Sequence, residues 1–155
     1  MYSDQDLINL NRSLRAYDQL IFQTRVLTIL TEVTLRLTSL KTVEGLLSFF
    51  RKNVPAPNQH ETTVILDRYT TLFNRMNQLA MLKGRCLSQS LVMRLLLNRK
   101  GISTALKIGL SQSKGVFDAH AWLEKDGMIL NDQPLIIANY LVLPEGKLNT
   151  ILKFK

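Results

Sequence analysis

Apolar residues in the first fifty positions recur with the period of an α-helix. They fall at spacings of three and four in two slightly rotated series: Leu7, Leu10, Leu14, Tyr17 and Ile21, then Phe22, Val26, Ile29, Val33, Leu37 and Leu40. This spacing gathers apolar side chains on one face of a helix. The pattern predicts a helical N-terminal region over residues 1–60.

The apolar run from residue 20 to residue 40 raises the question of a membrane span. Arg25, Glu32 and Arg36 lie inside it, and charges at mid-bilayer are costly. We therefore expect an amphipathic helix that packs on the rest of the protein or on a partner. Its attachment to a membrane surface is possible, but nothing in the sequence supports it.

Two further helices are predicted in the middle of the chain. Residues 52–60 contain two prolines and His60 and are typical of a loop. From Glu61 to about residue 80 an apolar face recurs, and after Gly84 a new helix is predicted from about Cys86 to Asn98. It ends at Arg99-Lys100-Gly101, since a basic last turn followed by glycine is a common C-terminal signal.

After residue 101 the period changes from helical to alternating, as in β-strands. Residues 102–110 and 118–125 and the short run 128–132 are expected strands, and residues 111–115 a loop. A last strand is expected either in residues 134–143 or in the tail 152–155. Helices followed by an antiparallel sheet predict an α+β fold.

The turn between residues 118–125 and 128–132 decides whether His120 and Asp132 can meet. A two-residue loop, Asp126-Gly127, would point Asp132 away from the face that carries His120. A three-residue loop that begins at Lys125 would place His120 directly opposite Asp132, because a register shift of one residue reverses the faces. Glycine suits the third place of such a loop, so we favour the three-residue loop.

Composition and charge indicate the number of domains, the compartment and the kinds of partner to expect. A chain of 155 residues is expected to form one domain, to which a helical N-terminal region can be added. One cysteine and a polar start without a secretory signal favour the cytoplasm. The net charge is +8, and residues 61–100 carry seven basic and two acidic groups, so the excess lies around Cys86. It could attract nucleic acid, an anionic membrane surface or an acidic peptide, or it could be a solvated face.

Cys86 is predicted at a helix N-terminus. The unpaired backbone N–H groups and the positive dipole end there favour a thiolate, the form that a sulfur nucleophile needs. A histidine would complete its activation, and an aspartate would orient that histidine. The alternative is that Cys86 is a small buried apolar residue, which is the commoner role of a single cysteine.

The stretches GRCLSQSLVMRLLLNRKGISTALKIGL (84–110) and FDAHAWLEKDGMILND (117–132) resemble the lasso-peptide leader peptidases, stand-alone transglutaminase-like proteins of lasso-peptide biosynthesis. The resemblance covers roughly residues 80–135. It implies a transglutaminase-like or papain-like core over 61–155, in which Cys86 is the nucleophile, His120 the general base and acid, and Asp132 the orienting residue. It further implies a cysteine peptidase that removes the leader of a ribosomally made precursor peptide and leaves a free core-peptide amine.

The resemblance also implies partners. Fused relatives carry a β-rich leader-binding domain before the peptidase, whereas residues 1–60 are predicted to be helical. A separate leader-recognition protein is therefore implied, and a separate ATP-dependent cyclase would use the released amine.

Other functions stay open. The same three residues would serve a transglutaminase-like acyl transferase or amidase, or the chain could be a non-catalytic peptide-binding module. Nucleic acid is not an expected partner, because no aromatic residues interleave with the basic ones. No cofactor is expected: Cys86, His60 and His120 are too few for a zinc site, and no glycine-rich phosphate loop is present.

Overall fold

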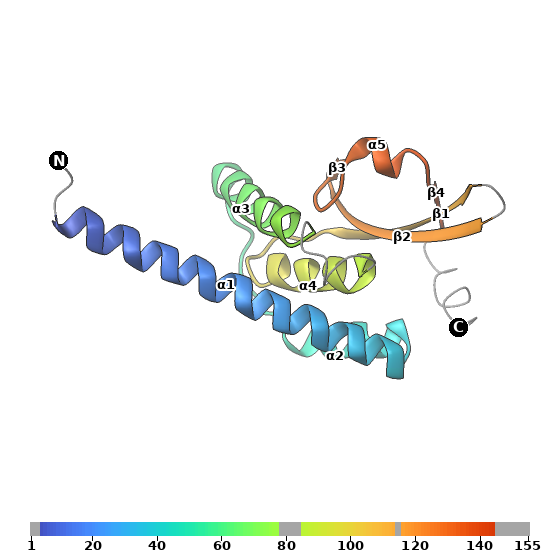
Figure 1. Cartoon of the computed structure of the whole chain (residues 1–155), viewed down its shortest axis with the longest axis horizontal. Coiled ribbons are helices and arrows are strands. Elements are labelled where there is room, and N and C mark those ends of the chain that lie inside the picture. Colours follow the sequence, from blue (N-terminus) through green and yellow to red (C-terminus); the bar gives the residue numbers. More distant parts are fainter. Residues whose placement is uncertain (1–3, 78–84, 114–115, 145–155) are drawn as a thin grey trace.

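A computed structural model of the chain describes residues 4–77, 85–113 and 116–144, and it confirms the α+β class (Figure 1). In chain order, the elements are α1 (Asp4–Leu37), α2 (Leu40–Phe49), α3 (Gln59–Asn77), α4 (Cys86–Asn98), β1 (Ala105–Ser113), β2 (Val116–Lys125), β3 (Met128–Ile129), α5 (Pro134–Ile137) and β4 (Leu141–Val142). The strands form one antiparallel sheet in the order β3-β2-β1-β4.

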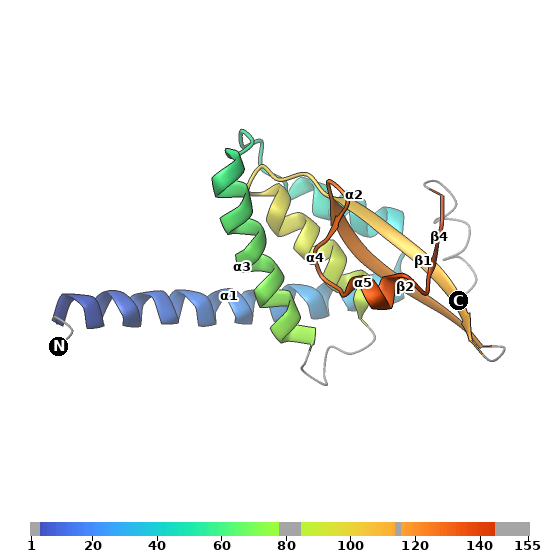
Figure 2. The same cartoon turned by 90° about the horizontal axis from the view of Figure 1, so that it is seen from above.

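Helix α4 is the centre of the fold. It packs against α1, α2 and α3 and against β1 and β2 of the sheet. Figure 1 shows it between α1 and the sheet, and Figure 2 shows it beside α3. A helix covered on several sides needs apolar residues around most of its circumference. Accordingly, Leu91, Val92, Met93, Leu95 and Leu97 are all buried. The sequence predicted this helix with the bounds that the structure shows.

The face by which α1 packs on the protein combines buried threonines with partly buried apolar residues, among them Tyr17, Ile21 and Leu27. Thr24 and Thr28 are fully buried and Thr31 nearly so. The hydroxyl of Thr24 donates to the Leu20 carbonyl at 2.7 Å, and that of Thr28 to the Thr24 carbonyl at 2.8 Å. Because each hydroxyl is satisfied within its own helix, these small side chains can be buried without the cost of an unpaired polar group.

The members of the second apolar series that belong to α1 lie on its exposed side, whereas Leu40 is buried in α2. Phe22 is 66 % exposed, and Val26, Ile29, Val33 and Leu37 are also exposed. The helix as a whole packs on the rest of the chain through its other face, which confirms one of the two expectations, and packing of this exposed face on a partner stays a prediction. None of the helices in the described ranges has the length and apolar content that a membrane span needs.

Local hydrogen bonds explain where α2 and α3 begin. Ser39 accepts the backbone N–H of Thr42, which caps α2. Asn58 and Glu61 each accept the other's backbone N–H, a capping box that starts α3 at Gln59. His60 therefore lies in the first turn of α3 and not in the predicted loop.

Several boundaries of the C-terminal half differ from prediction. Residues 111–113 extend β1 and are not part of a loop. The last described strand, β4, lies within 134–143, and the alternative place in the tail is outside the described residues. The division of the chain at residue 60 stays a prediction, although Leu40 and Val43 of the first part share one core with α3 and α4.

Replacing Gly101, in the turn after α4, and Gly45, in α2, by alanine should change the free energy of unfolding in opposite directions. Gly101 has φ +77°, and a Cβ there would lie 2.5 Å from the Pro55 carbonyl oxygen, whereas a Cβ on Gly45 in α2 would meet nothing within 4 Å. We expect Gly101→Ala to lower the free energy of unfolding by about 1–3 kcal/mol. The control Gly45→Ala should raise it by about 0.5–1 kcal/mol. Urea unfolding measures both, and equal effects would contradict this description of the turn.

Candidate active site

The hairpin that carries His120 has the register that the sequence analysis did not favour. Asp126 and Gly127 form a two-residue turn with φ of 50° and 79°, and Lys125 pairs with Met128. Two successive residues with positive φ match the twist of the two strands. The three-residue loop is therefore wrong, because Asp126 tolerates the left-handed conformation that only Gly127 was expected to adopt.

In this register a continued β3 would carry Asp132 to the wrong face, but β3 ends at Ile129. The Leu130 N–H still donates to the Leu123 carbonyl at 2.9 Å. The return bond from the Leu123 N–H goes to Asn131 Oδ1 at 2.8 Å, where a continued ladder would use the Leu130 carbonyl. The side chain of Asn131 thus takes the place of a backbone acceptor, and the chain bends over residues 130–132. This bend brings Asp132 back to His120.

Asn131 also ties the hairpin to α4. Its Nδ2 donates to Ser90 Oγ at 2.9 Å, and Ser90 Oγ donates to the Ala121 carbonyl at 3.2 Å. Ser90 is fully buried and Asn131 is only 3 % exposed. Buried hydrogen bonds of this kind fix one arrangement, because any other leaves polar groups unpaired.

This buried network, which we call the Asn131 clamp (Ser90, Ala121, Leu123 and Asn131), holds the neighbours of the three predicted residues. Ser90 lies about one helical turn after Cys86, Ala121 follows His120, and Asn131 precedes Asp132. The structure accordingly brings Cys86, His120 and Asp132 together.

His120 is hydrogen-bonded to both other residues. Its Nε2 pairs with Asp132 Oδ2, and Asp132 Oδ1 accepts the backbone N–H of Gln133 at 2.7 Å. The thiol of Cys86 is hydrogen-bonded to the His120 side chain and to the backbone of Ala121 and Leu87. Because α4 begins at Cys86, the first N–H groups of the helix have no intrahelical acceptor and are available to negative charge.

The electrostatics of the site favour the charged forms of all three groups. The hydrogen bonds to Asp132 and then to Cys86 raise the pKa of His120 to about 10, against the opposing effect of burial. Burial raises the pKa of Cys86, but its hydrogen bonds with His120 and Ala121 outweigh burial and lower it. The pKa of Asp132 is likewise raised by burial and lowered, on balance, by the hydrogen bond with His120. The arrangement therefore supports a thiolate beside an imidazolium.

Aromatic rings enclose His120. The ring centroids of Trp122 and Tyr140 lie 6.3 Å and 5.2 Å from that of His120. Gly109 pairs with His120 across the sheet, and a Cβ there would lie 2.7 Å from Tyr140 Cβ and 3.0 Å from the Trp122 ring. Because Gly109 has no side chain, Trp122 and Tyr140 can occupy the space beside it.

Some residues around the site were predicted and others were not. Trp122 was predicted as a core aromatic on the face of His120, and it is fully buried. Sequence reasoning missed Tyr140, whose hydroxyl donates to Asp118 at 2.6 Å, because nothing in the local pattern marks it. It also missed Gly109, although an isolated glycine inside a strand can mark a close approach of other groups. His60 is exposed on α3 and takes no part in the site.

A comparison with known protein families identifies the fold. The profile of the transglutaminase-like superfamily matches residues 27–145, which include Cys86, His120 and Asp132. The chain belongs to the transglutaminase-like superfamily. No curated protein and no solved structure matches it.

Membership of the transglutaminase-like superfamily fits the chemistry of the site. This superfamily includes cysteine peptidases and acyltransferases, and its fold is commonly that of a cysteine-dependent enzyme. Within the described residues, no group of three or more His, Cys, Asp and Glu side chains gathers as a metal site would require.

The Asn131 clamp predicts that the pKa of His120 depends on a residue that does not touch it. Replacing Asn131 by Leu removes the acceptor of the Leu123 N–H, so Asp132 should leave His120 and the pKa of His120 should fall toward 6.5. NMR titration of the His120 ring measures this pKa.

The matched control is Asn74→Leu on the exposed part of α3, which should leave the pKa of His120 unchanged. Ser90→Ala removes one partner only and provides a milder variant if Asn131→Leu does not fold. A folded Asn131→Leu protein whose His120 still titrates near 10 would show that the clamp does not position Asp132.

Proposed function

We propose that this chain is a cysteine peptidase that removes the leader from a ribosomally made lasso-peptide precursor, with Cys86, His120 and Asp132 as its catalytic triad. The observation that carries the triad is that His120 is hydrogen-bonded to both Cys86 and Asp132. The leader-peptidase specificity is supported by the resemblance of residues 84–110 and 117–132 to the lasso-peptide leader peptidases.

The reaction begins with a thiolate. Because Nε2 of His120 is bonded to Asp132, Nδ1 is the ring nitrogen left to face the sulfur of Cys86. The Cys86 thiolate attacks the scissile carbonyl carbon, and the N–H groups at the start of α4 stabilise the negative oxygen that forms. The imidazolium gives its proton to the leaving nitrogen, so the core peptide departs with a free amine and the leader stays as a thioester.

Water completes the cycle. Neutral His120 takes a proton from water as the oxygen attacks the thioester carbonyl, and the thiolate of Cys86 leaves. Asp132 holds the imidazole in one orientation and stabilises its charged form in both steps. The net reaction is hydrolysis of one peptide bond.

The proposed partners are a separate leader-recognition protein and the ATP-dependent cyclase that uses the released amine. The exposed apolar side chains of α1, among them Phe22, Leu30 and Leu37, support a protein partner, because apolar surface of this kind often marks an interaction site. The single cysteine supports a cytoplasmic location.

Replacing any residue of the triad should sharply lower turnover, whereas matched control replacements outside the triad should not. Cys86→Ala, His120→Ala and Asp132→Asn should each lower the rate of leader removal by about 10³-fold or more. His60→Ala and Asp126→Asn change the other histidine and an exposed turn aspartate, and we expect them to retain the wild-type rate.

Mass spectrometry of the precursor encoded beside this chain, with and without the leader-recognition protein, measures the reaction. A shortened leader and a free core peptide indicate hydrolysis, whereas an added amine on the leader would assign the chain to the acyltransferases of the superfamily. Turnover retained in Cys86→Ala would contradict the proposal.

The pH dependence of kcat/KM should be bell-shaped and broad on its alkaline side. The thiolate–imidazolium pair exists above the lowered pKa of Cys86 and below the pKa of His120, which is about 10. Activity should therefore fall in acid, as the thiolate takes up a proton, and again near pH 10, as His120 loses one. In Asp132→Asn the alkaline limb should move to lower pH. An unchanged limb in that variant would contradict the assigned role of Asp132.

A further inference from the structure

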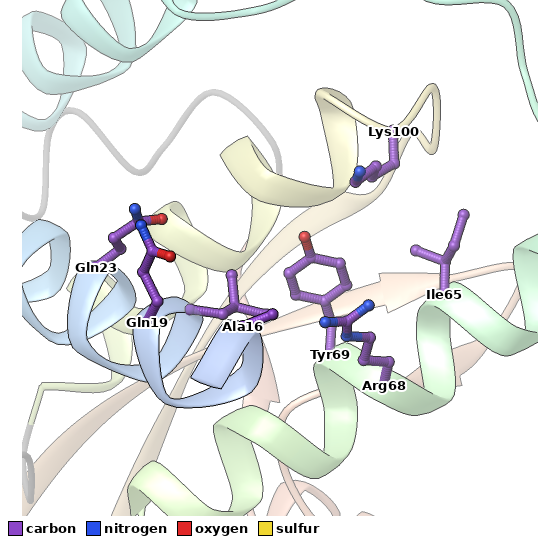
Figure 3. A pocket seen from close by; sticks show the side chains of 8 residues that line it. Ala16, Gln19, Gln23, Ile65, Arg68, Tyr69 and Lys100 are labelled. Carbon is purple, nitrogen blue, oxygen red and sulfur yellow. The ribbon is translucent and has the colours of Figure 1, made fainter. Parts of the chain in front are cut away.

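A cavity of about 400 Å³ lies between α1, α3 and the turn that follows α4 (Figure 3). Its polar lining consists of Gln19 and Gln23 from α1, Arg68 and Tyr69 from α3, and Lys100. The length of α4, roughly 20 Å for thirteen residues, separates Lys100 from Cys86 at the other end of the helix. The cavity is therefore distinct from the candidate active site.

The charged groups of this cavity are all positive. Arg68 and Lys100 line it without any acidic side chain, and neither forms an ion pair with another residue that the structure describes. The charge of Arg99 also acts on Tyr69, together with that of Arg68. Arg68 and Lys100 are both exposed, so solvent screens their mutual repulsion, but together they give the cavity a positive potential that favours an anion.

Tyr69 supplies a second, independent observation. The residue is only 6 % exposed, and its hydroxyl has no hydrogen-bond partner among the described residues. Figure 3 shows this hydroxyl and the Lys100 amine directed into the same space, with the Arg68 side chain beside the Tyr69 ring. The Tyr69 ring is buried, while its hydroxyl oxygen reaches the open space of the cavity and can donate to a ligand that binds there.

We propose that this cavity binds an oxyanion, a carboxylate or a phosphate carried by a small ligand or by an acidic peptide side chain. The planar guanidinium of Arg68 matches two oxygens of such a group, and Lys100 and the Tyr69 hydroxyl provide further donors. The cavity is larger than a bare anion needs. The rest of the ligand would contact the remaining lining, which consists of the amides of Gln19 and Gln23 and the apolar side chains of Leu20 and Ile65.

The proposal is tested by isothermal titration calorimetry of the full chain with two probes, inorganic phosphate and a tripeptide of glutamate, at low salt. We expect saturable binding of at least one probe, weakened about tenfold or more in Arg68→Gln/Lys100→Gln. Tyr69→Phe, which removes only the hydroxyl, should weaken binding by a smaller factor. Binding of phosphate alone assigns the site to phosphate, and binding of the tripeptide alone assigns it to carboxylates.

The matched control is Lys41→Gln/Lys52→Gln, which removes the same charge from exposed positions outside the cavity. Cys86→Ala should bind as the wild type does, so the result is independent of the proposed peptidase activity. Absence of saturable binding for both probes, or an equal loss in the control variant, would overturn the proposal.

Discussion

The candidate active site depends on one hydrogen bond, from the Leu123 N–H to the side chain of Asn131. The two-residue turn at Asp126-Gly127 sets a register that would send Asp132 to the wrong face of the sheet. Asn131 ends the ladder by offering its own amide oxygen, and the chain turns back within two residues. Because Asn131 is buried and also bonded to Ser90 of α4, the bend cannot relax without unpairing several polar groups. A strand ladder that stops early is thus what lets a tight hairpin present an aspartate to a histidine.

The same network couples geometry to electrostatics. Half-burial alone would favour the neutral thiol and the neutral imidazole, and these two neutral groups make a poor nucleophile. The hydrogen bonds of His120 to Asp132 and Cys86 reverse this preference, but only while the three groups stay within bonding distance. Trp122 and Tyr140 restrict the His120 ring from two directions, and Gly109 provides room for both. Rigid packing therefore maintains a charge distribution that flexible side chains in water would not keep.

How far the sequence predicts this structure depends on whether the deciding interactions are local. The bounds of α4 follow from nearby residues, such as Gly101, and were predicted correctly. The favoured three-residue loop at residues 125–127 was wrong, because Asp126 also adopts a positive φ. The meeting of His120 and Asp132 was also anticipated, but from the wrong turn. The true cause is a contact between Asn131 and strand β2 that periodicity does not report. The burial of Thr24 and Thr28 and the exposure of the apolar series from Phe22 to Leu37 were missed for a similar reason. A threonine hydroxyl that is hydrogen-bonded within its own helix costs little free energy to bury. An apolar face that finds no partner in the chain stays exposed.

Helix α4 carries opposite chemistry at its two ends, and the helix dipole favours both. Its N-terminus, with unpaired N–H groups, stabilises the negative sulfur of Cys86, while its C-terminus favours the cations Arg99 and Lys100 that follow it. Part of the positive excess of residues 61–100 therefore lies away from the thiol, at the far end of α4. Lys100, at the far end of the helix, faces a cavity where Arg68 adds a second positive charge. The charges of Lys100 and Arg68 lie roughly a helix length from Cys86, and solvent screens them over such distances. They therefore do little to stabilise the thiolate form of Cys86. The pKa of Cys86 is lowered by the hydrogen bonds that the thiol itself makes. The basic end of α4 is not needed for this effect, and we propose that it binds a different ligand.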